Sequence, residues 1–210
     1  MPVWQSLFGE MKDHGFTVLA VAMDRPETAR PWIEAAAATY PCLIDRDHYV
    51  ADLYNMVNVP QAVWIDEEGR IIRPPETAGS MDAFRAMDRG TFTIPDEVMA
   101  ERNRVKTQYF DAVCDWVRRG SGSVHAMNAT RATEKLKLPD ATIAEAHARF
   151  HLGRYLLREG REAEAQVQMA EASRLHPDSW AMWRQAAAKD TRGLASGPEF
   201  WKRVDALGSR

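Results

Sequence analysis

A Val-Pro dipeptide at residues 59–60, followed by a hairpin pattern, is the feature that most constrains how this chain can fold. Pro60 pushes Val59 into an extended conformation, and a proline is tolerated at the first residue of a strand. The apolar runs at 62–65 and 70–72 are separated by an acidic turn that closes on a glycine. This spacing is typical of a β-hairpin. The sequence therefore predicts a strand that starts next to Pro60 and pairs with the segment that follows it.

The chain before this hairpin alternates between helical and strand patterns. The predicted elements are a helix over 4–13, a strand over 16–22, a helix over 31–38, a strand over 40–44 and a helix over 47–57. The first of these strands is apolar at consecutive positions, which favours a strand buried on both faces. Helices that alternate with short apolar strands predict an α/β domain.

Beyond residue 80 the patterns are helical. We expect a short helix over 80–87, a long one over 95–119, a flexible break from Gly120 to Ser123, and a further helix that opens at the capping box Thr142–Glu145. This change of character gives three predicted regions: an α/β domain over 1–90, a helical connector over 91–125 and a helical domain over 126–210.

The helical domain carries a repeat pattern. A set of its residues stands at the spacings of a tetratricopeptide repeat, namely Leu152, Gly153, Leu156, Ala165, Met169, Ala172 and Pro177. Trp183 lies one period of about 34 residues after Arg149, which occupies the motif's tryptophan position. The pattern predicts an all-α domain of the tetratricopeptide type. An antiparallel helix bundle without repeats is the alternative.

The order of elements over residues 1–80, with the Val59-Pro60 hairpin at its end, resembles the second half of a thioredoxin fold of the TlpA/ResA-like type. The resemblance implies an α/β thioredoxin-like domain, here lacking its first strand and redox motif, and a thiol–disulfide oxidoreductase of the protein disulfide reductase type. In that family the proline is cis, and the residue before it offers its backbone to an extended substrate. The candidate substrate-binding residues are therefore Val59 and Pro60, and the implied partner is a disulfide-bearing protein or thiol substrate.

Catalysis in that family needs a C-x-x-C motif at the first turn of a helix, where the helix dipole stabilises a thiolate. Some relatives carry selenocysteine in this motif. The present chain has two cysteines, and Cys42 and Cys114 are too far apart in sequence to form it. We therefore expect no catalytic residue in this chain, a start at an internal methionine of a longer protein, and a catalytic cysteine or selenocysteine motif upstream of it.

That expectation has a physical basis in the sheet. In the resembling fold, the strand before the redox motif lies between the strands at 17–22 and 62–66. Without it, two rows of backbone donors and acceptors lack partners, which costs free energy. A chain without that strand is expected to be catalytically inactive by itself. Two alternatives stay open: a non-catalytic interaction scaffold built on a degenerate thioredoxin fold, and a peroxiredoxin-like antioxidant protein.

Other reactive or ligating side chains favour structural roles. Cys42 and Cys114 lie in apolar segments and are expected to be buried, inert thiols. His147 and His151 stand four residues apart on a predicted helix, a spacing that can hold zinc, but no third ligand stands at a recognisable spacing. We therefore predict no metal site and no cofactor.

An acidic loop and a group of tryptophans complete the candidates. Asp45, Asp47 and His48 resemble the start of a calcium loop, but the glycine and the distal glutamate of such a loop are missing, so helix capping by an aspartate is expected. The tryptophans near the end of the chain are candidates for a peptide groove, although helix-core packing explains them better; they are Trp180, Trp183 and Trp201.

Composition narrows the range of partners. The formal net charge is −3 with both signs interspersed, which gives no reason to expect nucleic acid. No apolar run approaches the roughly 20 residues that a membrane span needs, and the first residues lack the basic and apolar regions of a secretory signal. The compartment is not predicted; a signal on a longer natural N-terminus would make the protein exported or periplasmic. A protein partner held by the helical repeat is the remaining expectation.

Overall fold

The structure is a computed structural model that describes residues 2–136, 138–191 and 193–207. The chain divides into two compact units. Unit 1 comprises Met1–Met56, Pro60–Ala83 and Asp88–Lys137, and unit 2 comprises Val57–Val59, Phe84–Met87 and Leu138–Arg210. The long helix α4 (Asp96–Arg119), which the sequence analysis places in a connector, packs within unit 1.

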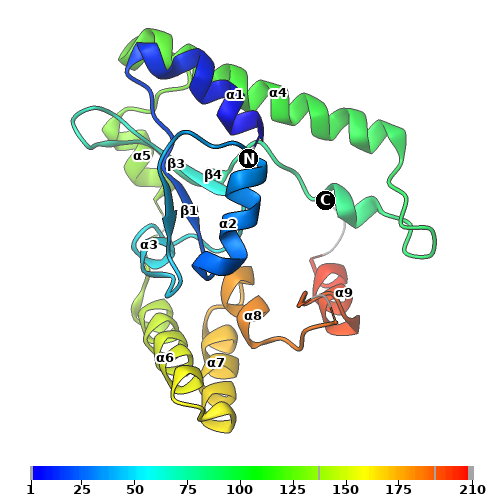
Figure 1. Ribbon diagram of the computed structural model, residues 1–210. Coiled ribbons are helices and arrows are strands. Elements are labelled where there is room, and N and C mark those ends of the chain that lie inside the picture. Colours follow the sequence, from blue (N-terminus) through cyan, green and yellow to red (C-terminus); the bar gives the residue numbers. More distant parts are fainter. Residues whose placement is uncertain (1, 137, 192, 208–210) are drawn as a thin grey trace. The chain divides into compact units, whose positions relative to one another are not determined.

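Unit 1 opens with an alternation of helices and strands (Figure 1). Its elements are α1 (Pro2–Met11), the 3-10 turn η1 (Lys12–His14), β1 (Ala20–Ala22), α2 (Pro26–Ala35), β2 (Cys42–Ile44) and α3 (Tyr49–Leu53). Leu7 and Met11, one turn apart on α1, are buried as the apolar face predicts. Gly15 ends this helical segment with a φ of +75°, which glycine adopts without strain. The predicted α/β order is confirmed.

Several element boundaries differ from the prediction. Helix α2 begins at Pro26 because a proline at the first helical position loses no hydrogen bond, and Pro31 lies inside the helix instead of at its start. Helix α3 ends at Leu53, before the predicted end at residue 57, and the Leu53 side chain is 84% exposed. The helix predicted over 80–87 is only a 3-10 turn, η2 (Ala83–Ala86).

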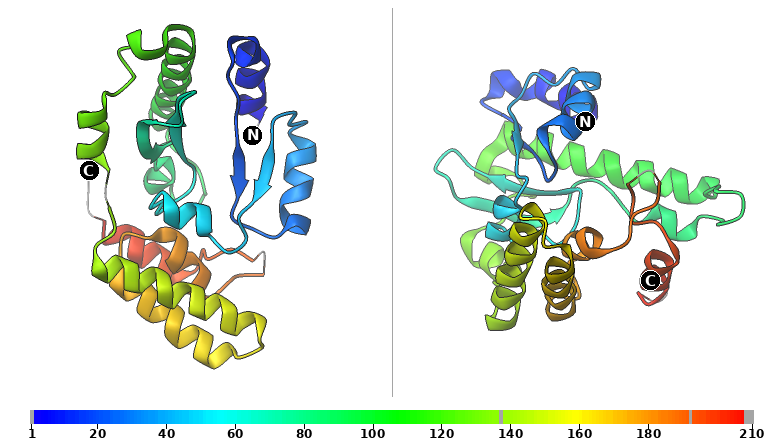
Figure 2. Two further views of the ribbon diagram at one scale, coloured as in Figure 1. Left: turned by 90° about the vertical axis from the view of Figure 1, so that its left-hand side faces the viewer. Right: turned by 60° about the horizontal axis from the view of Figure 1, so that its bottom comes forward.

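The strands form two separate two-stranded sheets. β1 pairs in parallel with β2, and β3 (Gln61–Ile65) pairs antiparallel with β4 (Ile71–Thr77). Among the described residues no ladder joins the two pairs, although both belong to unit 1. β1 is the strand of its pair that lies toward the hairpin (Figure 2). The expected burial of the first strand on both faces is wrong, since Leu19 and Val21 are 62% and 37% exposed.

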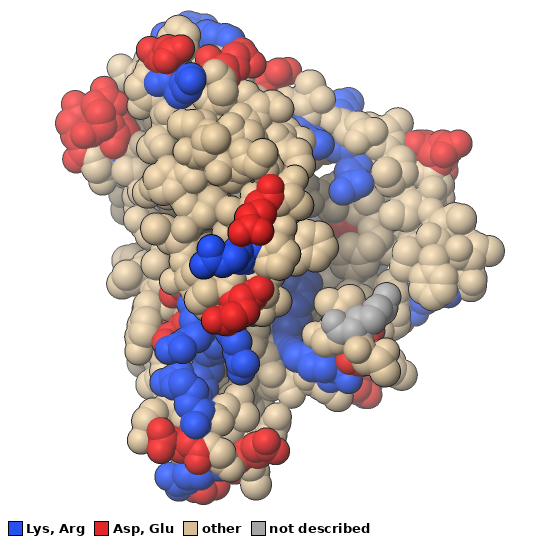
Figure 3. All heavy atoms as spheres, in the orientation of Figure 1, with Lys and Arg blue, Asp and Glu red and all other residues tan. Residues whose placement is uncertain are grey.

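The predicted hairpin after Pro60 is confirmed. Gly69 closes the turn with a φ of +79°. The Asp66 carboxylate accepts hydrogen bonds from the backbone N–H groups of Glu68 and Arg70 at 3.1 and 2.8 Å, which fixes the turn. The turn is acidic, and its side chains form the red group at the left of Figure 3.

The outer edge of β4 is closed in two ways. The strand contains Pro74 and Pro75, which have no N–H to donate, and its register against β3 shifts around them. The segment after α4 covers the same edge: the Met127 N–H donates to the Ile72 carbonyl at 3.2 Å. Strand β4 therefore offers no regular row of backbone groups to a further strand.

The core of unit 1 lies where the hairpin meets α1 and α4. Its buried residues are Leu7, Met11, Trp64, Ala112 and Val113. The Trp64 indole N–H donates to the Tyr109 hydroxyl at 2.9 Å, and the Trp64 ring stacks on Trp116 at a centroid distance of 5.2 Å. The unit is completed by η3 (Gly120–Gly122) and α5 (Ala129–Lys135).

Unit 2 is mainly helical, with α6 (Ala141–Arg158), α7 (Glu162–Leu175), α8 (Trp180–Ala186) and α9 (Pro198–Asp205). The first helix begins after Asp140, whose carboxylate accepts the Ile143 N–H at 2.9 Å, so the predicted capping box at Thr142 is wrong. Helices α6 and α7 pack closely at Gly153, where a Cβ would lie 3.1 Å from the Ala165 carbonyl oxygen. The helices are confirmed; their assignment as tetratricopeptide repeats stays a prediction.

Candidate functional site

The two candidate substrate-binding residues stand at the entrance to β3. Val59 is 56% exposed, and its N–H donates to the Asn58 side-chain oxygen at 2.9 Å. The Pro60 carbonyl accepts the Ala78 N–H at 3.2 Å, which fixes the proline at the end of the β3–β4 ladder. The structure thus places both residues where a strand begins, as predicted. Their role in binding a substrate stays a prediction.

Neither cysteine is a ready nucleophile. Burial raises the pKa of the Cys42 thiol, which donates to the Tyr40 carbonyl at 3.6 Å. Burial, followed by the nearby Glu10 carboxylate, raises the pKa of the Cys114 thiol. A thiol with a raised pKa is protonated at neutral pH and is a poor nucleophile. Both thiols are free and only half-buried, so the expectation of full burial is wrong, whereas the raised pKa values agree with the expected inertness.

The start of α1 has the electrostatics that a reactive thiol needs. Its first turn contains no acidic residue, so no carboxylate compensates the positive end of the helix dipole. A thiolate at such a position is stabilised and its pKa falls. Neither Cys42 nor Cys114 lies on this turn. Among the described residues, no thiol therefore lies at the positive end of the α1 dipole.

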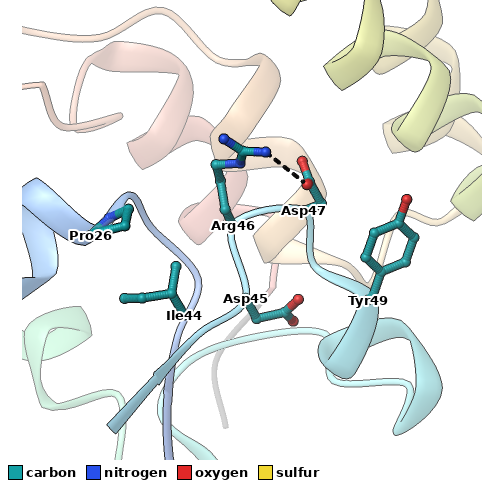
Figure 4. Close-up of a pocket in the computed structure, with 6 residues that line it drawn as sticks. All are labelled: Pro26, Ile44, Asp45, Arg46, Asp47 and Tyr49. Atoms are coloured by element: carbon teal, nitrogen blue, oxygen red, sulfur yellow. Dashed lines mark hydrogen bonds and ion pairs between the residues drawn. The ribbon is translucent and has the colours of Figure 1, made fainter.

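A pocket of about 300 Å³ lies at the carboxyl ends of β1 and β2, and Figure 4 shows the residues that line it: Pro26, Ile44, Asp45, Arg46, Asp47 and Tyr49. The carboxyl ends of parallel strands are where α/β folds commonly bind ligands. Arg46 and Asp47 form an ion pair at 3.4 Å on its rim. The Asp45 carboxylate points toward α3 and accepts the Val50 and Ala51 N–H groups at 2.9 and 3.1 Å. The predicted capping role of this aspartate is confirmed.

His147 and His151, which share the four-residue spacing of a zinc pair, belong to no candidate metal cluster in the part of the chain that the structure describes. There, no group of three or more histidine, cysteine or acidic side chains is arranged to hold a metal ion. The His147 ring stacks on His176 at a centroid distance of 5.9 Å, which is a packing role.

The tryptophans of unit 2 form an aromatic cluster. Trp180 and Trp183 contact each other edge-on at 5.7 Å, and Phe200 of α9 contacts both rings. The Arg203 guanidinium lies over Trp180 and Trp183, at 5.0 and 5.4 Å from the ring centroids. Because all these rings are half-buried and contact one another, they hold α8 against α9, which favours core packing over an open peptide groove.

Sequence reasoning missed a polar group beside the core of unit 1. The Arg73 guanidinium lies 4.8 Å from the centroid of Trp64 and pairs with Glu76 at 2.6 Å. Burial raises the pKa of Tyr109 to about 12. The alternation of Arg73 with apolar neighbours in the hairpin is the signal that could have found this group. Its contacts join β4 to Trp64 of β3, which in turn donates a hydrogen bond to Tyr109 of α4.

Comparison with known proteins gives a family model and a curated relative, each matching about a third of the chain. Residues 1–73 match a family model described as the AhpC/TSA family. The N-terminal part is thioredoxin-like. A curated thiol-disulfide oxidoreductase ResA from Halalkalibacterium halodurans is 31% identical over 74 residues, which span 35% of this chain and 42% of the relative. No solved structure gives a significant match.

The family match and the structure confirm the coarse part of the predicted resemblance: a thioredoxin-like N-terminal domain, followed by a mostly helical part. The chain spans less than half of the curated relative that it matches. None of the described helices is long and apolar enough to cross a membrane.

Proposed function

We propose that this chain is part of a thioredoxin-like thiol–disulfide oxidoreductase, and that its redox cysteine or selenocysteine is carried by a strand and loop outside these residues. The observation that carries the proposal is the divided sheet of unit 1. In the part of the chain that the structure describes, no ladder joins β1–β2 to β3–β4, although residues 1–73 of this unit match the AhpC/TSA family model. A strand between the halves would pair both and would deliver a thiol to the first turn of α1.

Two further observations support this arrangement. The first turn of α1 has no carboxylate that would raise a neighbouring thiol's pKa. Val59 is exposed directly before β3, so its backbone carbonyl and side chain are available to an extended substrate. The substrate class that suits this site is a protein disulfide, held by backbone hydrogen bonds while the thiolate attacks one sulfur and the second thiol resolves the mixed disulfide.

The test is a variant of the full chain extended ahead of α1 by an uncharged strand and a Cys-x-x-Cys sequence. We expect this variant to reduce a protein disulfide in the presence of a thiol reductant, and its first thiol to react with iodoacetamide at lower pH than free cysteine does. The matched control carries Ser-x-x-Ser and is expected to be inactive. The unextended chain should be no faster than its Cys42→Ser, Cys114→Ser variant. A folded extended variant with an ordinary thiol pKa and no turnover would contradict the proposal.

We also propose that α6, α7 and the start of α8 act as a tetratricopeptide-like module that holds a protein partner. The support is the close approach of the two helices at Gly153, where the Met169 side chain fills the space that a Cβ would occupy, and the end of α7 just before Pro177. This role is tested by a pull-down that compares the original chain with a variant changed at an exposed position of α6, such as Leu152→Asp. The variant is expected to lose the bound partner. Retention of every partner by that variant would contradict it.

A second candidate function, a non-catalytic interaction scaffold, is favoured by the raised pKa values of both thiols. The extended variant separates the two functions. The oxidoreductase needs the added thiols to become acidic and active, whereas the scaffold gains no activity from them.

A further inference from the structure

The loop before β3 is attached to helix α8. Residues 57–59 and α8 belong to the same compact unit, so this attachment lies within unit 2. The Ala181 N–H, in the first turn of α8, donates to the Val57 carbonyl at 3.0 Å, which satisfies one of the backbone donors that a helix leaves open at its start. The Arg184 guanidinium, about one turn further along, donates to the Asn58 side-chain oxygen at 2.8 Å. Two hydrogen bonds therefore fix the loop just before the candidate substrate-binding residues.

The same Asn58 oxygen occupies the backbone N–H of a candidate substrate-binding residue. It accepts the Val59 N–H at 2.9 Å. Pro60 has no N–H, so this is the last backbone donor before β3 begins at Gln61. An extended partner pairs with a strand residue through both its N–H and its C=O. Because its N–H is bonded to Asn58, Val59 cannot make that pair until this bond opens.

Arg184 holds the Asn58 amide in one orientation. Both groups that contact the amide oxygen are donors, namely the Val59 N–H and the guanidinium; an amide nitrogen, which only donates, could not take its place. The guanidinium also lies 5.6 Å from the centroid of Trp180, so the ring limits its movement. Hydrogen bonds from a charged donor are stronger than those between neutral groups. A half-buried arginine of α8 therefore keeps the Asn58 oxygen on the Val59 N–H.

We propose that Asn58 and Arg184 form a latch on the substrate-binding loop: the Asn58 oxygen occupies the Val59 N–H in the resting chain, and a substrate segment must displace it. The inference rests on the proposed function, because its substrate is the protein disulfide assigned there. Arg184 is a positioning residue, since it acts on Val59 through the Asn58 amide.

The latch discriminates between substrates by their backbone conformation. A segment gains from opening it when its backbone pairs with both the N–H and the C=O of Val59, which requires an extended conformation. The backbone groups of a helix are already bonded to one another and cannot do so. The latch therefore selects disulfides in extended or locally unfolded segments over disulfides in helices.

Amide hydrogen exchange of the full chain at Val59 tests the latch itself. Asn58→Ala removes the acceptor and should speed exchange of this amide at least about fivefold. Arg184→Met keeps an apolar stem beside Trp180 but donates nothing, and it should speed exchange at least about threefold. Arg184→Lys keeps a charged donor and should return exchange to within about twofold of the original chain. Unchanged exchange at Val59 in Asn58→Ala overturns the inference.

Arg203 supplies the matched control. Its guanidinium lies over the same Trp180 ring, at 5.0 Å from the centroid, and donates to the Pro177 carbonyl instead of the loop. Arg203→Met therefore removes a cation from the ring and leaves the donor to Asn58 in place, so Val59 exchange should stay within about 1.5-fold of the original chain. Equal effects of Arg184→Met and Arg203→Met would reveal a general loosening of unit 2 and would overturn the inference.

The effect on the substrate is measured in the Cys-x-x-Cys extension of the full chain. With a protein disulfide as substrate, Asn58→Ala should lower KM at least about threefold, with kcat within about twofold, because opening the latch costs binding alone. Asn58→Asp keeps the acceptor and adds a charge that strengthens both bonds, so it should raise KM at least about threefold. If Asn58→Ala unfolds unit 2 by circular dichroism, Asn58→Asp decides. A bond that merely supports the loop predicts a higher KM for Asn58→Ala, and that result overturns the inference.

The exchange and the kinetics separate this inference from the proposed function. An active extension whose KM does not respond to Asn58 overturns the latch and leaves the oxidoreductase function intact. An inactive extension in which Asn58 still controls Val59 exchange defeats the oxidoreductase function. The latch then has no substrate to select, and the inference falls with that function.

Discussion

The helix pair α6–α7 and the strand pair β1–β2 show two different states of packing in one chain. In the helix pair, Ala146, Phe150 and Met169 are completely buried. In the strand pair, Val21 and Leu43 are 37% and 50% exposed. The strands are the more apolar of the two in sequence, so composition alone predicts the opposite order of burial.

The difference follows from where each element finds its partners. Helices satisfy their backbone groups internally, and α6 meets α7 after a short turn at Gly160, so the pair can complete its core by local contacts. A strand needs a neighbour on each side to satisfy its backbone. β1 has β2 on one side and no ladder on the other among the described residues. The core of α6 and α7 is therefore closed by contacts that are local in the chain, with Met182 of α8 added. β1, in contrast, has one edge without a ladder among the described residues.

The largest expected effect tests whether α6 and α7 share a fully buried core. Phe150→Ala removes a fully buried ring and should lower the free energy of unfolding of unit 2 by about 3–5 kcal/mol. Leu152→Ala, two residues away and 45% exposed, is the matched control and should cost less than about 1 kcal/mol. Urea unfolding followed by helix circular dichroism measures both. Similar losses for the two variants would show that the pair has no closed core.

The next effect tests whether the β3–β4 hairpin is packed against α4, so that Tyr109 is buried between them. Tyr109 has a pKa of about 12 in the folded chain, against 10.0 for an ordinary tyrosine, because it is buried. The unfolded chain therefore loses this proton first as the pH rises. The contribution of protonated Tyr109 to the free energy of unfolding is fully present below pH 10. It is lost between about pH 10 and 12, at up to about 1.4 kcal/mol per pH unit.

Absorbance at 295 nm measures this titration. Tyr109→Phe should remove the ionisation near pH 12, and Tyr155→Phe on α6 should leave it in place. If every tyrosine ionised near pH 10, Tyr109 would be exposed to solvent, and the packing of α4 on the β3–β4 hairpin would be contradicted.

The smallest effect compares one substitution at two helical glycines. At Gly153 a Cβ would contact the Met169 side chain and the Ala165 carbonyl, so Gly153→Ala should destabilise by about 1–3 kcal/mol despite its better helix propensity. At Gly9 of α1 nothing lies within 4 Å of an added Cβ, so Gly9→Ala should stabilise by about 0.5–1 kcal/mol. Thermal unfolding measures the change in Tm for each variant; Gly153→Ala should lower the Tm and Gly9→Ala should raise it. A shift of the same sign for both variants would contradict the close packing of α6 on α7.

Sequence reasoning found the features that depend on neighbours along the chain. The acidic turn before Gly69 predicts the hairpin because its residues fix the turn locally. The capping role of Asp45 is likewise local, since its carboxylate accepts hydrogen bonds from the helix that follows it. The order of elements and the thioredoxin-like resemblance followed from such signals.

The features that sequence reasoning missed depend on distant contacts. The apolar run before Ala22 predicts a buried strand, but burial needs a partner on its second edge. The stacking of Arg73 on Trp64 and the closure of β4 by Met127 join segments that no local pattern connects. For the site, the sequence located Val59 and Pro60 and the lack of a C-x-x-C motif. That no ladder joins β1 to β3 among the described residues could be identified only from the strand pairing.

The central claim is that β1 and β3 each have one edge without a ladder among the described residues. Residue-resolved amide hydrogen exchange of the full chain tests it most directly, because one experiment compares these edges with the core of α6 and α7. The account predicts that the amides of Val21 and Val63 exchange rapidly, while those of Phe150 and Met169 are strongly protected. Protection of Val21 and Val63 equal to that of Phe150, in the chain without any added strand, would contradict the claim that the sheet of unit 1 is incomplete.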